Sequence, residues 1–346
     1  MTEQISAEIT DPGAWLGPDI QAGDEDWIRH LSAEALADLD AALRHVQKAG
    51  LQIPFGKEDF PLNACAAELA ALLPEVQNGL GFRVLRGIPR DKYSDAECEL
   101  LYWGIGVHIG SPVSQNDRGH LLGHVLDEDR SYDDPSARGY QTAQRMDFHC
   151  DLLPVDVLGL FCLHQAKSGG ESHLVSSLTV HNVLRRERPD LLDVTYQPFH
   201  LDWRDEEPDG EQPWYAIPMF SAADGQVTSR FTSRQYLQSC ERFGAEYTIT
   251  DAQTECLDLV QQIANRPELQ VSFRLQEGDI QLVNNHTTMH ARDAFEDYDD
   301  PALKRHLLRM WIALSNDMRR PLSPELDCRS KWVEAGGIPL KESAAG

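Results

Sequence analysis

Apolar positions in the first part of the chain recur at the spacing of an amphipathic helix. Between residues 24 and 49 they mark a single face, and the segment ends at Gly50, a residue type that commonly closes helices. Ser32 lies inside the segment and is a candidate internal cap. The apolar positions are Leu36, Leu39, Leu43 and Val46. We therefore expect an outer helix that packs through one side.

Two further helices and an early strand are expected next. Residues 62–76 have a helical pattern, and "GFRVLRGIP" (81–89) is a short apolar run with turn residues at both ends, which is typical of a strand. A third helix should begin near Ser94. Ser94 and Glu97 form the S-x-x-E pattern, in which each side chain binds a free backbone N–H of the first turn.

From about residue 119 the pattern changes to short apolar runs separated by Gly, Pro, Asp and Asn. The runs include "HLLGHVLD", "VLGLFCLHQA", "ESHLVS", "PFHLDW", "QVTSRF", "LQVSFRL", "DIQLVNN" and "LLRMWIAL". Many short strands at this spacing indicate a β-sandwich or barrel. Two helices interrupt them, at about 178–187 and 252–265. In "VSFRLQEGDIQLV" (271–283), apolar residues alternate on both sides of a Glu-Gly-Asp turn, which predicts a hairpin.

No repeat, low-complexity tract or flexible linker divides the sequence, so the simplest organisation is one domain over residues 1–346. We expect a helical N-terminal layer at about 20–110, a β core at about 80–315 and a C-terminal tail at 316–346. The stretch 126–145 shows no periodicity over about 20 residues, a length that in compact domains is often functional. We expect it to act as a lid.

Charge and composition restrict the partners. The chain has 56 acidic and 31 basic side chains and a formal net charge of -25, which repels nucleic acid phosphates and anionic lipids. No secretory signal is visible, and no stretch approaches the roughly 20 apolar residues that cross a bilayer, so a cytoplasmic location is expected. The seven cysteines form no CxxC pair, which argues against a cysteine-built zinc site.

Candidate metal chemistry appears in "RMDFHCDLLP" (145–154). In a strand, His149 and Asp151 project to one face and Cys150 to the other. Together with a second imidazole from a distant strand, they would form the two-His-one-carboxylate triad that holds Fe(II) and leaves positions open for a chelating co-substrate and oxygen. The dipeptide pattern alone is not specific, because His200 and Asp202 repeat it in "PFHLDW".

The order of motifs provides the specificity. After the first His-x-Asp pair come the turn "GGES" (169–172), then "VNNHTTMHARDAF" (283–295), then "KRHLLRMWI" (304–312). This order resembles the taurine dioxygenase family of Fe(II)- and 2-oxoglutarate-dependent oxygenases, and the resemblance touches most of residues 80–315. It implies a mainly β fold with flanking helices, built on a double-stranded β-helix (jelly-roll, cupin-like) core.

The resemblance also implies site residues. It assigns His149, Asp151 and His290 to iron, and Ser172 with an arginine of the last strand to 2-oxoglutarate. His286 competes with His290, but the family's spacing to Arg292 favours His290. The family often has Asp at the position of Asn284, and Thr at the position of Ser172, whose hydroxyl can still donate to a carboxylate.

Two arginines compete for the far carboxylate of 2-oxoglutarate. Arg305 and Arg309 are four residues apart and should share one face of a strand. A planar guanidinium binds a carboxylate through two parallel charge-assisted hydrogen bonds, which explains why an arginine suits this position. We expect Arg309 to bind the far carboxylate and Arg305 to support it.

The implied activity is hydroxylation of an unactivated C–H bond, with oxygen as co-substrate and release of succinate and carbon dioxide. The expected substrate is a small polar or carboxylate-bearing molecule, such as an amino acid, an organic acid or a natural-product intermediate. Desaturation or cyclisation are other outcomes of the same chemistry. The family also implies a homodimer or homotetramer. Candidate substrate contacts are Gln115, Asn116, Arg230 and Arg234.

Two alternatives belong to other classes. The same ligands in a β-barrel could bind zinc or manganese for hydrolysis or isomerisation. A barrel that had lost catalysis would be a metal-free binding module. Formation of a visible charge-transfer band with Fe(II) and 2-oxoglutarate under argon discriminates the oxygenase from both.

Overall fold

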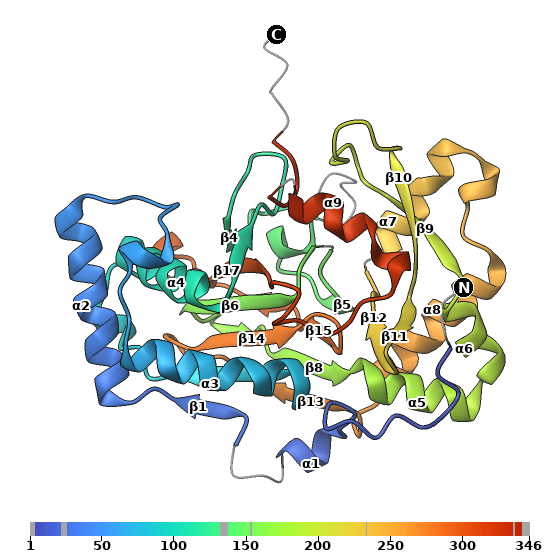
Figure 1. Ribbon diagram of the computed structural model, residues 1–346, viewed down its shortest axis with the longest axis horizontal. Coiled ribbons are helices and arrows are strands. Elements are labelled where there is room, and N and C mark those ends of the chain that lie inside the picture. Colours follow the sequence, from blue (N-terminus) through green and yellow to red (C-terminus); the bar gives the residue numbers. More distant parts are fainter. Residues whose placement is uncertain are drawn as a thin grey trace.

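The computed structural model describes residues 4–21, 26–131, 138–152, 154–232, 234–334 and 336–340. A seven-stranded sheet forms its centre, in the order β1-β2-β14-β6-β17-β3, with β4 also paired to β17 (Figure 1). The strands are β1 (Ile28–His30), β2 (Phe82–Arg86), β3 (Ser111–Val113), β4 (Leu122–Val125), β6 (Val157–His164), β14 (Ile280–Asn284) and β17 (His306–Ala313).

A four-stranded sheet in the order β13-β8-β15-β5 lies beside it and shares its hydrophobic core. Its strands are β5 (Met146–His149), β8 (Ser172–Ser176), β13 (Gln270–Phe273) and β15 (Thr288–Arg292). Three two-stranded pairs complete the β structure. They are β9 (Pro198–Asp202) with β10 (Trp214–Pro218), β11 (Phe220–Ala223) with β12 (Gln226–Ser229), and β7 (Ser168–Gly169) with β16 (Phe295–Glu296).

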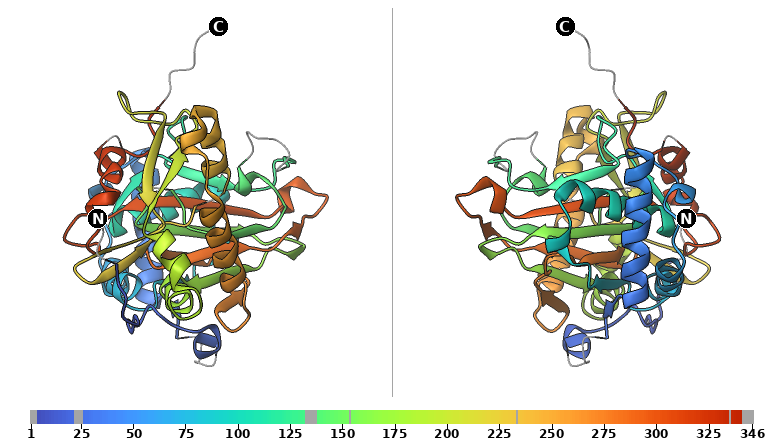
Figure 2. Two further views of the ribbon diagram at one scale, coloured as in Figure 1. Left: turned by 90° about the vertical axis from the view of Figure 1, so that its right-hand side faces the viewer. Right: turned by 90° about the vertical axis from the view of Figure 1, so that its left-hand side faces the viewer.

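Helices cover the sheets on two sides. Figure 2 shows the orange-brown α8 in front of the strands from one side and the blue α2 in front from the opposite side. The helices are α1 (Gly17–Gln21), α2 (Ala33–Ala49), α3 (Ala64–Asn78), α4 (Asp95–Ile109), α5 (Ser177–Glu187), α6 (Pro189–Thr195), α7 (Arg234–Gln238), α8 (Asp251–Ala264) and α9 (Cys328–Glu334). Within the described ranges, none of these helices has the length and apolar composition needed to span a bilayer.

The apolar side chains of β17 alternate between two hydrophobic cores. Leu308, Met310 and Ile312 belong to the core formed with α2, α3 and α4. Leu307 and Trp311 alternate with them and belong to the core between the sheets. Because side chains in a strand alternate between faces, Arg309 lies on the same inner face as Trp311.

The first predicted helix begins later than expected. Residues 22–25 of the expected segment lie outside the described residues, and Ile28–His30 instead form β1, which pairs in parallel with β2. Ser32 is the N-cap of α2 and accepts a hydrogen bond from Ala35 N at 3.0 Å. The strand forms because the buried Trp27 and Ile28 pack into the core between the sheets. The predicted capping box at Ser94 is confirmed at the start of α4.

The hairpin predicted within 271–283 is wrong. Strand β13 pairs with β8 in the small sheet, whereas β14 pairs with β2 and β6 in the large one. The turn between them carries the chain from one sheet to the other. Asp279 is anchored by Arg86 through two bonds of 2.9 and 2.8 Å. Gly278 has φ 89°, and a Cβ there would lie 2.1 Å from Ile88 O, so only glycine fits.

The segment expected to form a lid is described only in part. Residues 132–137 lie outside the described residues, so lid closure stays a prediction. The segment's last part contains a short 3-10 turn at Gly139–Gln141.

Candidate metal centre and its two cavities

Three ligand residues converge where β5 ends. His149 closes β5, Asp151 follows two residues later, and His290 is the register partner of His149 on β15. The Asp151 Oδ1 atom lies 3.7 Å from His149 Nε2 and 3.9 Å from His290 Nε2. In the described part of the chain, this is the group of His, Cys, Asp or Glu side chains close enough to share one metal ion, with ligand atoms all within 4.8 Å of one another.

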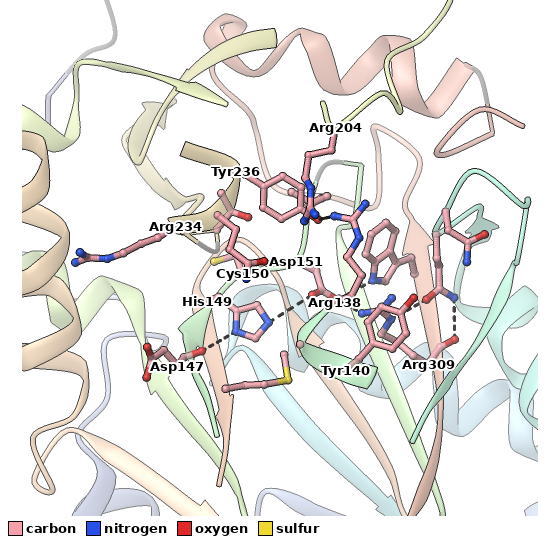
Figure 3. A pocket seen from close by; sticks show the side chains of 18 of the residues that line it. Arg138, Tyr140, Asp147, His149, Cys150, Asp151, Arg204, Arg234, Tyr236 and Arg309 are labelled. Carbon is pink, nitrogen blue, oxygen red and sulfur yellow. Dashed lines mark hydrogen bonds and ion pairs between the residues drawn. The ribbon is translucent and has the colours of Figure 1, made fainter. Parts of the chain in front are cut away.

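Neighbouring groups set the orientation of two ligands. His149 Nδ1 lies 2.8 Å from the carbonyl oxygen of Asp147, so this nitrogen carries the proton and Nε2 keeps its lone pair (Figure 3). Trp311 Nε1 donates to Asp151 Oδ2 at 2.7 Å, which leaves Oδ1 facing the two imidazoles. A carboxylate oxygen and two imidazole nitrogens in this arrangement suit a divalent first-row metal such as iron.

Asn285 fixes the backbone at Asp151 and was missed by the sequence interpretation. Its side-chain oxygen accepts from Asp151 N at 2.8 Å, and its amide nitrogen donates to Asp151 O at 2.9 Å. Asn285 is fully buried. The only signal in the sequence was an Asn-Asn doublet ahead of the predicted distal histidine, which gives no reason to pair Asn285 with Asp151.

Burial and charge act against each other at the ligands. Burial raises the pKa of Asp151, but Arg309, His290, His149 and the Trp311 N–H together lower it below its usual value. Burial, followed by the nearby His149, lowers the pKa of His290 to about 3. The carboxylate and the neutral imidazole are the forms that bind metals.

His286 has a different environment from His290. It lies in the turn before β15, and its Nε2 is 2.7 Å from Asp156 Oδ1. Arg230 approaches its Nδ1 at 3.0 Å and also donates to Val155 O at 3.2 Å. Arg230 is buried and lines none of the described cavities. We therefore no longer propose Arg230 as a substrate contact, because both of its terminal nitrogens bind groups inside the fold.

The second His-x-Asp copy lies on β9, away from the metal ligands. The His200 ring packs edge-on against Trp214 and Tyr247. Asp202 accepts from Arg204 N at 2.7 Å and from Arg242 Nη2 at 2.9 Å. This pair is therefore structural.

An inner cavity of about 50 Å³ extends from the three ligands into the space between the sheets. Ser172, Gln281, Arg305 and Arg309 also line it. Arg305 is 5% exposed, and burial lowers its pKa to about 10. In the described structure, Arg305 Nη1 and Gln281 Oε1 are buried without a hydrogen-bond partner. A buried guanidinium donor is rarely left unpaired unless a ligand accepts from it, so Arg305 makes this end of the cavity suitable for an organic anion.

The two arginines lie at different depths. Arg309 Nη1 is 3.9 Å from Asp151 Oδ2, so its guanidinium borders the metal ligands. Arg305 precedes β17, just ahead of the register shift between His306 and Leu307, and also lines a small adjoining cavity of about 10 Å³ with Ser172. Gln115 accepts from Arg309 Nε at 2.7 Å and donates to Arg309 O at 2.9 Å. Gln115 therefore holds Arg309 in place.

An outer cavity of about 320 Å³ adjoins the ligands on the other side (Figure 3). Asn116 and Arg234, both predicted substrate contacts, line it. Asn116 Nδ2 lies 3.2 Å from His120 Nδ1. The guanidinium of Arg234 pairs with Asp258 and points away from His149 in Figure 3. The cavity wall also contains residues that the sequence interpretation missed, namely Arg138, Tyr140, Arg204, Glu206 and Tyr236.

The chain is similar to known proteins over most of its length. A family model described as "Taurine catabolism dioxygenase TauD, TfdA family" matches residues 43–311. FR-33289 synthase of Streptomyces rubellomurinus is 32% identical over 328 residues, which cover 93% of this chain and 95% of that protein. The taurine hydroxylase-like protein SAT17 of Stachybotrys chartarum is 28% identical over 333 residues, covering 93% and 84%.

Solved structures share the architecture. An asparagine oxygenase in complex with Fe(II), 2S,3S-3-hydroxyasparagine and succinate superposes with a TM-score of 0.59 at 17% sequence identity. The superposition covers 92% of this chain and 100% of the oxygenase. This likeness confirms the expected fold class, a jelly-roll core with flanking helices.

Proposed function

Because the chain belongs to the Taurine catabolism dioxygenase TauD, TfdA family, we propose that His149, Asp151 and His290 hold its Fe(II). The protein is an Fe(II)- and 2-oxoglutarate-dependent oxygenase. The observation that carries the residue assignment is the convergence of three ligand atoms, from the last residue of β5, from the second residue after β5, and from β15. The orientation of His149 by Asp147 O and of Asp151 by Trp311 supports it.

When Fe(II), 2-oxoglutarate and oxygen are bound, they supply the oxidation of an unactivated C–H bond, with succinate and carbon dioxide as by-products. The chain's own residues hold the ligands, orient the co-substrate and exclude water. Asp151 provides the carboxylate ligand, which favours transfer of a hydroxyl group to the substrate as the outcome.

The co-substrate is proposed to lie in the inner cavity, with the arginine roles reversed from the initial expectation. The deeper Arg305, with Ser172 and Gln281 beside it, is placed to bind the far carboxylate. A buried guanidinium with an unused donor gains a charge-assisted pair there. Arg309 is placed beside the metal ligands, where it would contact the end of 2-oxoglutarate that chelates the metal.

The substrate is proposed to be a small polar molecule with an anionic group, bound in the outer cavity. The cavity volume of about 320 Å³ is at the small end of the range for ligand sites. The relative described as taurine hydroxylase-like adds support, since taurine is a small sulfonate. The net charge of -25 supports the proposal that neither nucleic acid nor an anionic membrane is a partner.

Anaerobic spectroscopy tests the assignment. Addition of Fe(II) and 2-oxoglutarate to the full-length protein under argon should produce a weak visible charge-transfer band. Arg305→Gln should weaken 2-oxoglutarate binding about 10- to 100-fold in a titration of this band, because a charge-assisted pair in a buried cavity is lost. Arg274→Gln, near the same cavity but hydrogen-bonded to Ala166 O, is the matched control. Absence of the band in the wild-type protein would contradict the proposal.

A further inference from the structure

The last described residues of the chain, 336–340, lie against the end of β3 beside the outer cavity. Ser114, the residue that follows β3, donates its N–H to Gly336 O at 2.8 Å and accepts from Ile338 N at 3.0 Å. The two bonds form a parallel bridge between Ser114 and Gly337. Residues 336–340, called the C-terminal segment below, therefore pair with the chain at the point where β3 leaves the central sheet.

The pairing leaves no room for a side chain at Gly337. Gly337 has φ 105°, and a Cβ there would lie 2.3 Å from Ser114 N. Gly337 N also donates to Trp332 O at 2.7 Å, which closes the turn that follows α9. Helix α9 is anchored in turn, because its buried Arg329 donates to the carboxylate of Asp156. Glycine at position 337 is therefore required for the C-terminal segment to reach Ser114.

Ile338 places the C-terminal segment in the wall of the outer cavity. Its side chain is 2% exposed and belongs to the hydrophobic core between the sheets. It lines the outer cavity, whose wall also includes Gln115 and Trp311. Because removal of an aliphatic side chain from water is favourable, Ile338 holds the C-terminal segment against this wall.

Gln115 follows Ser114 and links the C-terminal segment to Arg309. Its side chain accepts from Arg309 Nε at 2.7 Å and donates to Arg309 O at 2.9 Å. The same side chain fills space that Gly123 leaves on β4, where a Cβ would lie 2.7 Å from Gln115 Oε1. Because Arg309 Nη1 is 3.9 Å from Asp151 Oδ2, a shift of Gln115 would move a cation beside the metal ligands.

We propose that the C-terminal segment is a positioning element of the active site, which fixes Gln115 through Ser114 and thereby directs the Arg309 guanidinium at the metal-chelating end of 2-oxoglutarate. This inference rests on the proposed function, which puts that end of the co-substrate beside Arg309. The Ser114 carbonyl and the Gln115 N–H belong to one planar peptide unit. The bond from Ile338 N to Ser114 O therefore orients the peptide that carries Gln115.

The alternative is that the C-terminal segment only stabilises the fold. In that case, displacing the segment lowers the free energy of unfolding but leaves the affinity of the folded protein for 2-oxoglutarate unchanged. A positioning role instead predicts a loss of affinity that depends on the Gln115 side chain.

Gly337→Ala displaces the C-terminal segment in the full-length chain, because the added Cβ meets Ser114 N. Anaerobic titration of the visible band with Fe(II) and 2-oxoglutarate measures the effect. The affinity for 2-oxoglutarate should fall about threefold to tenfold, as expected when one hydrogen bond that positions a charged group is lost. Gly225→Ala is the matched control, since Gly225 has φ 75° but an added Cβ would meet nothing within 4 Å. This control should bind 2-oxoglutarate as the wild type does.

A double-mutant cycle with Gln115 separates positioning from a general loss of stability. Gln115→Ala alone should weaken 2-oxoglutarate binding about tenfold, because Arg309 loses its partner. In the Gln115→Ala background, Gly337→Ala should cause no further loss, since the C-terminal segment acts through Gln115. Losses that add in the double variant overturn the proposal. If circular dichroism shows that Gly337→Ala does not fold, Ile338→Ala replaces it in the same cycle.

Amide hydrogen exchange reports the docking independently of iron. In the full-length chain without added iron, exchange of peptides that contain Ser114 and Ile338 should be faster in Gly337→Ala than in the wild type, because the bridging N–H groups lose their acceptors. Unchanged exchange overturns the docking, and faster exchange with wild-type affinity for 2-oxoglutarate overturns the positioning role alone. Absence of the band in the wild type refutes the proposed function, whereas faster exchange in Gly337→Ala would still support docking of the segment on Ser114.

Discussion

The chain contains the His-x-Asp pattern twice, and the two copies have different roles. His149 and Asp151 lie at the end of β5, whose neighbour β15 brings a second histidine alongside. His200 and Asp202 lie on β9, whose strand partner is β10, and His200 faces the ring of Trp214 instead. A metal site therefore depends on what the neighbouring strand contributes.

The two aspartates also differ in which carboxylate oxygens are left free of hydrogen bonds from the protein. Asp151 uses Oδ2 for the Trp311 N–H and keeps Oδ1 directed at the imidazoles. Asp202 uses Oδ1 for both Arg204 N and Arg242. The Asp151 carboxylate is oriented to bind a metal ion, whereas the Asp202 carboxylate stabilises the backbone of a loop.

The largest expected difference between the copies is in iron binding. Asp151→Ala should weaken Fe(II) binding more than about 100-fold, because changes to residues behind a metal ligand already cost about 10- to 100-fold and this change removes a ligand itself. Asp202→Ala should retain the visible band with Fe(II) and 2-oxoglutarate. Anaerobic titration of both variants measures this, and loss of the band in Asp202→Ala alone would reverse our assignment.

The second difference is in folding stability. Asp202→Ala should lower the free energy of unfolding by about 1–3 kcal/mol, because it leaves the backbone N–H of Arg204 without its acceptor. Asp190→Ala, in an exposed pair with Arg188, is the control and should cost clearly less than Asp202→Ala. Urea denaturation followed by circular dichroism compares them. Equal losses would mean that Asp202 does not hold the loop.

Each copy has a tryptophan neighbour, which allows a finer test. Trp311→Phe keeps the aromatic ring but removes the donor to Asp151, so Fe(II) affinity should fall about tenfold. Trp214→Phe, beside His200, should leave Fe(II) affinity unchanged. The measurement is again the anaerobic titration. Unchanged affinity in Trp311→Phe would show that the indole N–H does not orient the carboxylate.

The last expected effect is a pH dependence of stability that comes from Glu206, four residues beyond Asp202 in the chain. Glu206 has a pKa raised from 4.5 to about 7 by burial, opposed by Arg138 and Arg204 and increased by Asp117. The folded state therefore binds this proton more tightly than the unfolded state. Wild-type stability should fall as pH rises from about 4.5 to 7, by about 1–3 kcal/mol from this group.

Glu206→Gln removes the titrating group and tests the sign. The stability of the variant relative to the wild type should increase as pH rises through this window and stay constant above it. Urea midpoints measured at intervals from pH 4.5 to 8 report the difference. Parallel curves for the two proteins would contradict a raised pKa at Glu206.

Sequence patterns predicted the parts of the structure that depend on local periodicity. The short apolar run "LLRMWIAL" predicted β17. The Ser94 capping box predicted the start of α4. The hairpin at 271–283 failed because one salt bridge, from Arg86 to Asp279, helps carry the chain between sheets, and such a distant pair leaves no mark in the local pattern.

The arginines that line the outer cavity could not all be predicted, for a similar reason. Arg230 and Arg234 were chosen from the sequence, whereas Arg138 and Arg204 lie against Tyr236 in the cavity. The direction of an arginine on a loop depends on backbone angles such as the positive φ at Arg204, and no periodicity encodes them. The ordered motifs did place His149, Asp151 and His290 together.

Strand β17 couples the helical layer to the metal ligands. Trp311 holds the Asp151 carboxylate, while its neighbour Met310 packs against α4 so closely that a Cβ at Gly106 would lie 2.0 Å from Met310 Sδ. A methyl group added at Gly106 would displace Met310 and press on the strand that carries the indole. A change in α4, a helix outside both cavities, would thus be transmitted through Met310 to the residue beside Trp311, and we expect variants that lack this helix to bind Fe(II) differently from the whole chain.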